Sequence, residues 1–300
     1  MFLNLLCLVL LAIRTLPTRG SISVASNETD SFRCDVLIAH VVRFDGSLQD
    51  MAFQNTDEVV SCLVDDLVYS IPKNIVETHK KELLTPGRKT MNVNGGSLPG
   101  RGNGGGSRKA SDEIVVPSTS VITFRKSGGR RKLSGSGSQH KIGTAEVLVI
   151  RVIANDARTS LSAKLLYDRI FGDGSNVVQD QDPNVPAGTL AKTYKDCSHG
   201  KLKIVPAKGY DIVKGVGFVK INMNVIGAIN RQVENAVTTA IDSKYGSVSN
   251  WDHIIYCLPS GTAGSWAAYG YNYYYRSVYN DEWCGQNSVV VHEIGHNIGL

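Results

Sequence analysis

Three residues close to the end of the chain, His292, Glu293 and His296, can together hold a metal ion and act on a water molecule beside it. Residues four apart lie on one face of a helix, so each histidine can offer a ring nitrogen to the same ion. Glu293 lies about 100° further round, turned away from the ligands but within reach of that water. We therefore predict that His292 and His296 bind Zn²⁺ and that Glu293 is the general base.

Gly299 extends this pattern. Residues 292–299 follow the zincin motif HExxHxxGxxH, whose third histidine would be the second residue beyond Leu300. A glycine at this place lets the backbone leave the helix sharply, so that a later ligand can return to the metal. The competing interpretation is a chance match on a structural helix, which the glycine makes rarer because only about 7% of residues are Gly.

Two upstream stretches accompany the motif, YKDCSHGKLKIVP (Tyr194 to Pro206) and YCLPSGTAGSWAAYGY (Tyr256 to Tyr271). With HEIGHNIGL they resemble the gametolysin family of secreted, metzincin-like zinc metalloproteases, over roughly residues 145–300. The resemblance implies a zinc endopeptidase that acts on extracellular matrix or cell-wall proteins and is made as a precursor. The sequence departs from the family pattern by ending before the third histidine and the methionine turn.

The N-terminus has the features of an export signal. An apolar run of about twelve residues, from Phe2 to Ile13, is too short to span a bilayer. We predict a signal peptide over residues 1–20 and a secreted, extracellular protein. No Lys or Arg precedes the run, so an uncleaved anchor is the alternative.

The remaining chain divides by composition. Short alternating runs such as Val36 to Ile38 and Leu63 to Ile71 predict a small β-rich pro-domain over residues 21–84, with a helix at 73–84. Residues 85–140 are rich in Gly, Ser and basic side chains and predict a flexible linker, in which only Ile114 to Phe124 are apolar enough to be ordered. Arg130, Arg131 and Lys132 in it offer a cleavage site to a processing protease, or a charge cluster for acidic polysaccharide. We expect no nucleic-acid partner.

Residues 141–300 alternate strands and helices, which predicts an α/β (α+β) catalytic domain with a twisted mixed sheet. The resemblance implies that the sheet is metzincin-like. The expected helices are 161–171, an amphipathic one at 226–241 and the zinc helix, which begins near Asn287 or Ser288 with either residue as its cap. The expected strands are 147–153, 202–205, 216–221 and 253–258.

The stretch between the last of these strands and the zinc helix is where zincins carry an edge strand that pairs with extended substrate. Its small and flat residues permit close approach of a peptide backbone. We predict that Trp266, Ala267, Ala268 and Tyr269 bind substrate.

Five cysteines follow the signal, Cys34, Cys62, Cys197, Cys257 and Cys284, an odd number for an oxidising compartment. A Cys34–Cys62 disulfide is one interpretation. The other is that one N-terminal cysteine binds the zinc as a thiolate and keeps the precursor inactive. The single histidines, His40, His79, His140, His199 and His253, are expected to be structural or solvated, with His199 the first to check as a replacement ligand.

Two functions fit these features. The first is a secreted zinc endopeptidase, and the second is an inactive zincin-like module or truncated remnant that binds matrix without cutting it. The presence of Glu293 favours the enzyme, because a module that only binds has no use for the base.

Overall fold

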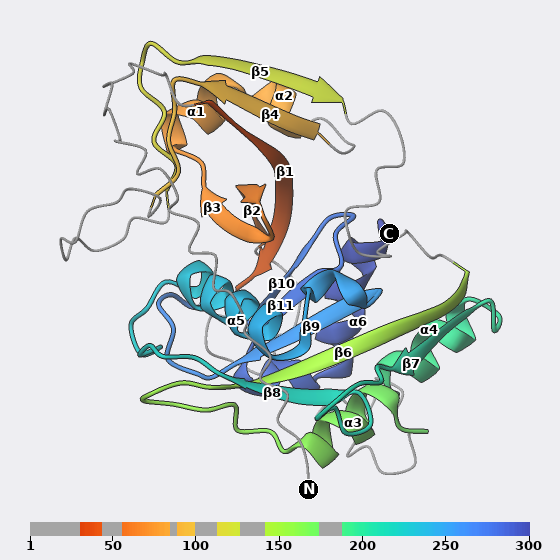
Figure 1. Ribbon diagram of the computed structural model, residues 1–300. Helices are drawn as coiled ribbons and strands as arrows, with labels where there is room; N and C mark the ends of the chain where they lie inside the picture. Colours follow the sequence, from red (N-terminus) through yellow and green to blue (C-terminus); the bar gives the residue numbers. More distant parts are fainter. Residues whose placement is uncertain (1–30, 44–55, 85–88, 100–112, 127–141, 174–187) are drawn as a thin grey trace, which may run out of the picture.

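The computed structural model describes residues 31–43, 56–84, 89–99, 113–126, 142–173 and 188–300 (Figure 1). These residues build one mixed sheet of eleven strands with helices packed on it, which confirms the predicted α/β class. Within these ranges no helix is both long and apolar enough to cross a membrane. The predicted signal peptide and the basic triplet Arg130, Arg131 and Lys132 lie outside the described residues.

The C-terminal half of the sheet is mostly parallel. Its strands are β6 (Gly143–Ile153), β7 (Leu202–Pro206), β8 (Val216–Lys220), β9 (His253–Leu258), β10 (Ala268–Tyr271) and β11 (Arg276–Asn280). β6 pairs in parallel with β7, β8 and β9, and β9 pairs in parallel with β11. β10 is antiparallel to β11 and lies at the end of this half of the sheet, next to β1. The four strands predicted here are therefore present.

Helices cover both faces of these strands. They are α3 (Ala163–Phe171), α4 (Leu190–Cys197), α5 (Asn230–Tyr245) and α6 (Asn287–Ile298), with short 3-10 helices η1 (Val248–Asn250) and η2 (Asp281–Gly285). Buried residues of α5 share one core cluster with β9 and β10. Buried residues of α3, α4 and α6 share a second cluster on the opposite face. The sheet therefore has a hydrophobic core on each side, as its apolar central strands require.

The prediction of a helix over 226–241 is wrong at its start. α5 begins at Asn230, and Ile226 and Ile229 are 66% and 45% exposed rather than part of the core. A turn in which the Ala228 N–H bonds to the Val225 carbonyl, 3.0 Å away, occupies the chain just before the helix. Hydrophobic periodicity cannot detect such a turn, because the isoleucines keep the helical spacing by coincidence.

The N-terminal half is β-rich, as predicted. It holds β1 (Ser31–Val42), β2 (Thr56–Val64), β3 (Leu67–Ser70), α1 (Lys73–Thr78), α2 (Lys80–Leu84), β4 (Lys89–Asn94) and β5 (Val121–Lys126). Cys34 and Cys62 form the predicted disulfide inside this half. Neither is therefore free to bind a metal as a thiolate, and that interpretation is wrong for these two residues.

The prediction of a flexible linker is wrong at residues 89–94, which form β4, whereas order was expected around Ile114 to Phe124. β4 pairs with β1 and β5, so both strands belong to the N-terminal fold. Met91, Val93 and Ile114 are at most 1% exposed. The glycine-rich composition of this region hid the short apolar pattern of β4. That strand is stabilised by pairing with β1, almost sixty residues earlier in the chain.

β1 joins the two halves into one sheet. It pairs with β4 and β2 in the N-terminal half and with β10 in the C-terminal half. The hairpin between β2 and β3 adds a second contact, because the Asp66 carboxylate accepts hydrogen bonds from the hydroxyls of Tyr274 and Tyr275, 3.2 and 2.9 Å away. The domain boundaries drawn from composition stay predictions. In the structure the strands of the two halves form one sheet, because β1 pairs with both β2 and β10.

A second disulfide, Cys257–Cys284, ties the end of β9 to η2. The bonded residues are 27 apart, and closing a loop of that length in the unfolded chain is worth about 3.5 kcal/mol. We expect the double variant Cys257→Ala/Cys284→Ala to lose about this much free energy of unfolding in urea. Cys197→Ala is the control, because Cys197 is free and exposed, and should change stability by less than about 0.5 kcal/mol. Equal losses in the two proteins would contradict the expectation.

Candidate metal centre

α6 carries the predicted metal ligands and begins at Asn287, as expected. The predicted side-chain cap is wrong, however, because the capping position is Gln286 and no side chain there accepts a cap hydrogen bond. The side chain of Asn287 instead donates from Nδ2 to Oγ1 of Thr193 on α4, 3.3 Å away. A contact between two helices has thus replaced the local cap, which a sequence pattern cannot show.

Further side-chain hydrogen bonds hold α6 against its neighbours. The hydroxyl of Tyr194 on α4 donates to the carbonyl of Val291 at 2.9 Å. At the other end, Asn297 Nδ2 donates to the carbonyls of Tyr271 and Arg276, at 3.0 and 2.9 Å. The helix is therefore fixed both to α4 and to the β10–β11 pair, so the position of its histidines is set by the sheet.

A glycine lets α6 lie directly on β10. A Cβ atom added to Gly270 would be 2.4 Å from the backbone oxygen of Glu293, closer than atoms pack. Only a residue without a side chain allows this approach. Gly270 therefore brings Glu293 against the strand predicted to bind substrate.

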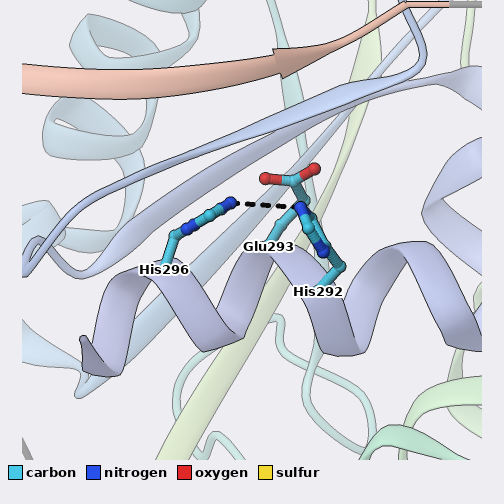
Figure 2. Close-up of side chains that lie close together, drawn as sticks. All are labelled: His292, Glu293 and His296. Carbon is cyan, nitrogen blue, oxygen red and sulfur yellow. Dashed lines mark hydrogen bonds between the residues drawn. The ribbon is translucent and has the colours of Figure 1, made fainter. Parts of the chain in front are cut away.

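The two histidines meet at their ring nitrogens (Figure 2). The Nε2 atoms of His292 and His296 are 3.1 Å apart, and the ring planes are nearly perpendicular at 87°. Two nitrogens bound to a tetrahedral zinc ion at about 2.0–2.1 Å are about 3.3 Å from each other. The arrangement therefore fits one ion shared by both rings.

Glu293 lies beside this pair. One ligand atom from each of His292, Glu293 and His296 falls within 4.8 Å of the others, and these three are the cluster with metal-binding spacing in the described part of the chain. Figure 2 shows the carboxyl group above the helix, next to the ring of His292. The spacing of the sequence motif thus becomes a compact constellation of two imidazoles and a carboxyl group.

Burial keeps both histidines neutral. It lowers the pKa of His292, with a further contribution from the nearby His40, and it lowers the pKa of His296 to about 4, with His292 and His40 adding to the effect. A metal ligand must be the neutral imidazole, so both rings are ready to bind a cation at neutral pH.

Burial acts in the opposite direction on Glu293. This side chain is fully buried, and the loss of water raises its pKa well above the usual range, although the nearby backbone N–H of Gly270 offsets part of that effect. Neither carboxyl oxygen has a well-formed hydrogen-bond partner. A buried carboxyl group with a raised pKa is typical of catalytic acids and bases.

The lowered pKa of His296 makes the stability of the metal-free protein depend on pH. A histidine in the unfolded chain has a pKa of about 6.5. Between pH 6.5 and about pH 4 the unfolded state therefore binds more protons than the folded state does. The contribution of His296 to the free energy of unfolding should thus be fully present above about pH 6.5 and should be lost as the pH falls toward about 4. Urea unfolding across this range should show a shallower fall in His296→Gln than in the parent. The exposed-site control His199→Asn should keep the parental slope, and equal slopes in all three proteins would refute the assignment.

Gly299 ends α6 as the motif predicted. Its φ of 77° is left-handed, and a Cβ atom there would lie 2.1 Å from the ring of Tyr273. The N–H groups of Gly299 and Leu300 bond back to the carbonyls of His296 and Gly295, at 3.1 and 3.0 Å. This closure turns the chain out of the helix at Gly299, three residues after the second histidine.

The predicted substrate-binding residues lie on or just before β10, next to α6. Their side chains do not reach the metal centre: Trp266 bonds to Thr262, and the hydroxyl of Tyr269 donates to Glu234 at 2.8 Å on the other face of the sheet. Trp266, Ala267, Ala268 and Tyr269 are each at most 4% exposed. Their backbone pairs with β1 on one edge and with β11 on the other, so their role in binding substrate stays a prediction.

His40, which was expected to be structural or solvated, lies beside the metal centre. Its ring stacks on that of His296, with centroids 4.8 Å apart and planes at 16°, although the two residues are far apart in the chain. No motif spacing could predict this, since the pairing of β1 with β10 brings them together. His199, the suggested replacement ligand, is exposed at a turn and is not part of the metal-binding cluster.

Comparison with known proteins agrees with this site. Residues 176–300 match the family model described as Gametolysin peptidase M11, which implies a metallopeptidase. No curated protein and no solved structure matches the chain. The matched segment contains α4, α5, β9, β10, β11 and the whole of α6. The resemblance to the gametolysin peptidase family is therefore confirmed over residues 176–300, the part of the chain that carries the two histidines and Glu293.

Proposed function

We propose that the protein is a secreted zinc metalloendopeptidase that hydrolyses peptide bonds in extracellular matrix or cell-wall proteins. The observation that carries this proposal is the meeting of the His292 and His296 Nε2 atoms, 3.1 Å apart, beside the buried carboxyl group of Glu293. The family match to metallopeptidases supports the same chemistry.

His292 and His296 would hold the metal, because both rings are neutral and their nitrogens have the separation that zinc requires. When bound, zinc supplies the Lewis acidity that polarises a peptide carbonyl and makes a water molecule easier to deprotonate. In this proposal Glu293 is the residue of the protein that transfers the proton.

Glu293 takes a proton from the attacking water as the water oxygen bonds to the carbonyl carbon of the peptide. It then gives that proton to the amine that leaves when the C–N bond breaks. Burial raises the pKa of Glu293 above that of an exposed carboxyl group, so the side chain holds a proton more firmly than such a group does. The fixed position of α6 on β10 holds the carboxyl group in place between the two steps.

Secretion is supported by two features. The apolar N-terminal run has the length of a signal peptide, and Cys34–Cys62 and Cys257–Cys284 are disulfides of the kind that persist in oxidising compartments. The basic triplet Arg130, Arg131 and Lys132 would then be exposed to a processing protease on the export route.

The proposal is tested by cleavage of casein with and without a zinc chelator. We expect chelation to abolish cleavage and added Zn²⁺ to restore it, while an inhibitor of serine proteases has no effect. Proteolysis that persists after complete removal of the metal would reject the proposal. Zinc binding without any proteolysis would favour the alternative, a module that binds matrix without cutting it.

A further inference from the structure

A pocket of about 210 Å³ lies where the two halves of the chain meet. β1 and β2 line it from one half, and α5 and the residues that lead into β10 line it from the other. Two of its lining residues, Tyr269 and Tyr271, belong to the core cluster on the α5 side of the sheet, whereas α6 packs on the opposite side. The pocket is therefore separate from the metal centre.

The hairpin of β2 and β3 is held on α5, which fixes the two sides of the pocket (Figure 1). Asn235 of α5 donates from Nδ2 to the Val68 carbonyl at 2.7 Å, and its Oδ1 accepts from the Val68 N–H at 2.8 Å. Both hydrogen bonds join a side chain of one half to the backbone of the other. The space between these elements is therefore a regular part of the folded chain.

Much of the pocket wall is apolar. It includes three aliphatic and three aromatic residues: Ala39, Val41, Val59, Trp266, Tyr269 and Tyr271. The hydroxyls of both tyrosines donate to Glu234, at 2.8 and 2.9 Å, and the indole N–H of Trp266 donates to Thr262 at 3.0 Å. The polar atoms of these rings are thus already used. Since an apolar cavity of about 150 Å³ accommodates benzene, this pocket has room for an aromatic ring with a short polar group.

The polar part of the wall carries positive charge. Arg43 on β1 and Arg231 on α5 both line the pocket, and none of the lining residues that the structure describes is acidic. Asp57, outside the pocket, accepts from Nε of Arg43 at 2.5 Å and balances part of that charge. Burial raises the pKa of Tyr269 and Tyr271, and the charge of Arg231 partly opposes this rise. The charge of Arg231 therefore acts on the wall of the pocket.

The start of α5 adds to this positive potential. Its capping residue Ile229 makes no side-chain cap hydrogen bond, and its first turn has no acidic residue. Asn230, which lines the pocket, accepts from the Arg231 N–H at 2.9 Å through Oδ1 and has an NH₂ group that can donate to another acceptor. The positive end of the helix dipole thus points to the same region as the Arg231 side chain, an arrangement that favours an anion.

Ser61 is an independent sign that a ligand binds here. Its side chain is 1% exposed, and its hydroxyl has no hydrogen-bond partner among the described residues. Ser61 and Val59 are two residues apart on β2, so their side chains lie on the same face of the strand, and both residues line the pocket. Buried hydroxyls in proteins normally have a partner. An acceptor atom of a bound molecule would provide one.

We propose that this pocket binds a small organic carboxylate with an apolar body, such as an aromatic acid. The carboxylate lies at Arg231 and the start of α5 and accepts from the Ser61 hydroxyl, while the apolar body lies against the rings of the pocket wall. Arg43, further along β1, adds to the positive charge. An inorganic anion would leave the apolar wall without a contact, and a neutral molecule would leave the charges without one. The inference goes beyond the proposed function and does not depend on it.

The test measures binding of 3-phenylpropanoate to the full chain by isothermal titration calorimetry. We expect a dissociation constant below about 1 mM. Binding should be at least about ten-fold weaker for 3-phenylpropanamide, which lacks the charge, and for acetate, which lacks the apolar body. The acid should also raise the urea midpoint of unfolding, because it binds the folded state across both halves. Absence of binding at 1 mM, or equal affinity for the amide, would overturn the inference.

Two variants locate the site in this pocket. Ser61→Ala should weaken binding at least about three-fold and keep the parental urea midpoint, since the hydroxyl has no partner to lose in the free protein. Arg231→Gln should weaken binding at least about ten-fold. The matched controls Ser160→Ala and Arg158→Gln, at exposed positions outside the pocket, should bind as the parent does. Parental affinity in both Ser61→Ala and Arg231→Gln would overturn the inference.

Carboxylates also bind zinc, so the titration is repeated after the metal has been removed with a chelator. Unchanged affinity would support a site away from the metal centre. Affinity that is lost together with the metal would place the acid at the metal centre and overturn the inference. Neither result depends on whether the protein cleaves casein, so this test and that of the proposed function can fail separately.

Discussion

Replacing Glu293 by glutamine should lower kcat for peptide hydrolysis by about 10²–10⁴, the usual contribution of general acid–base catalysis. Glutamine has nearly the same shape but cannot accept the proton from water. Glu293 is fully buried and lies within 4.8 Å of both histidine ligand atoms, so the change acts at the reacting centre. The measurement is the steady-state rate on a fluorogenic peptide once activity has been established.

Zinc content and the free energy of unfolding must be measured on the same Glu293→Gln protein, because a loss of metal or fold would also lower the rate. We expect both to match the parent, since the two imidazoles are untouched. Glu282→Gln, an exposed carboxylate on η2, is the control and should keep the parental rate. A Glu293→Gln protein with zinc and more than about a tenth of the parental rate would show that another group is the base.

Arg276→Met should destabilise the protein by about 3–5 kcal/mol, because it leaves a buried carboxylate without its counter-charge. The guanidinium of Arg276 lies 3.0 Å from Glu234, and both side chains are 0% exposed. It also donates to the hydroxyls of Thr238 and Tyr274, at 2.9 and 3.0 Å, and to the carbonyl of Asp66 at 3.0 Å. One arginine therefore links α5, β11 and the N-terminal hairpin.

Urea unfolding measures this loss. Lys164→Met is the control, because it breaks an ion pair with Asp168 in which the lysine is 82% exposed, and it should cost less than about 1 kcal/mol. The double variant Glu234→Gln/Arg276→Met should lose less than the sum of the two single variants, since it removes the unpaired charge as well. A loss of under about 1 kcal/mol for Arg276→Met would show that the pair is not a structural centre of the fold.

Much of the metal centre could be predicted because its geometry is local. The four-residue spacing of His292 and His296 fixes two ligands on one helix face, and Gly299 marks the end of that helix. His40 could not be predicted, because its contact with His296 depends on strand pairing between distant parts of the chain. Local patterns thus predicted His292, Glu293 and His296 but not that His40 stacks on His296.

The fold divides in the same way. The strands β6, β7, β8 and β9 could be read from continuous apolar runs, which buried parallel strands require. The start of α5 and the strand β4 could not, because a turn at Val225–Ala228 decides the first and pairing with β1 decides the second. The buried Arg276 was missed for a related reason, since its partner Glu234 lies on a different element.

The most direct test of the account is the zinc content of the purified protein and of its His296→Ala variant, measured by mass spectrometry of the metal after dialysis. The account predicts about one zinc ion per chain in the parent and in the exposed-site control His199→Asn, and loss of the metal in a folded His296→Ala protein. Zinc retained in full by the His296→Ala protein, or absent from the parent at saturating zinc, would contradict a metal centre built on His292 and His296.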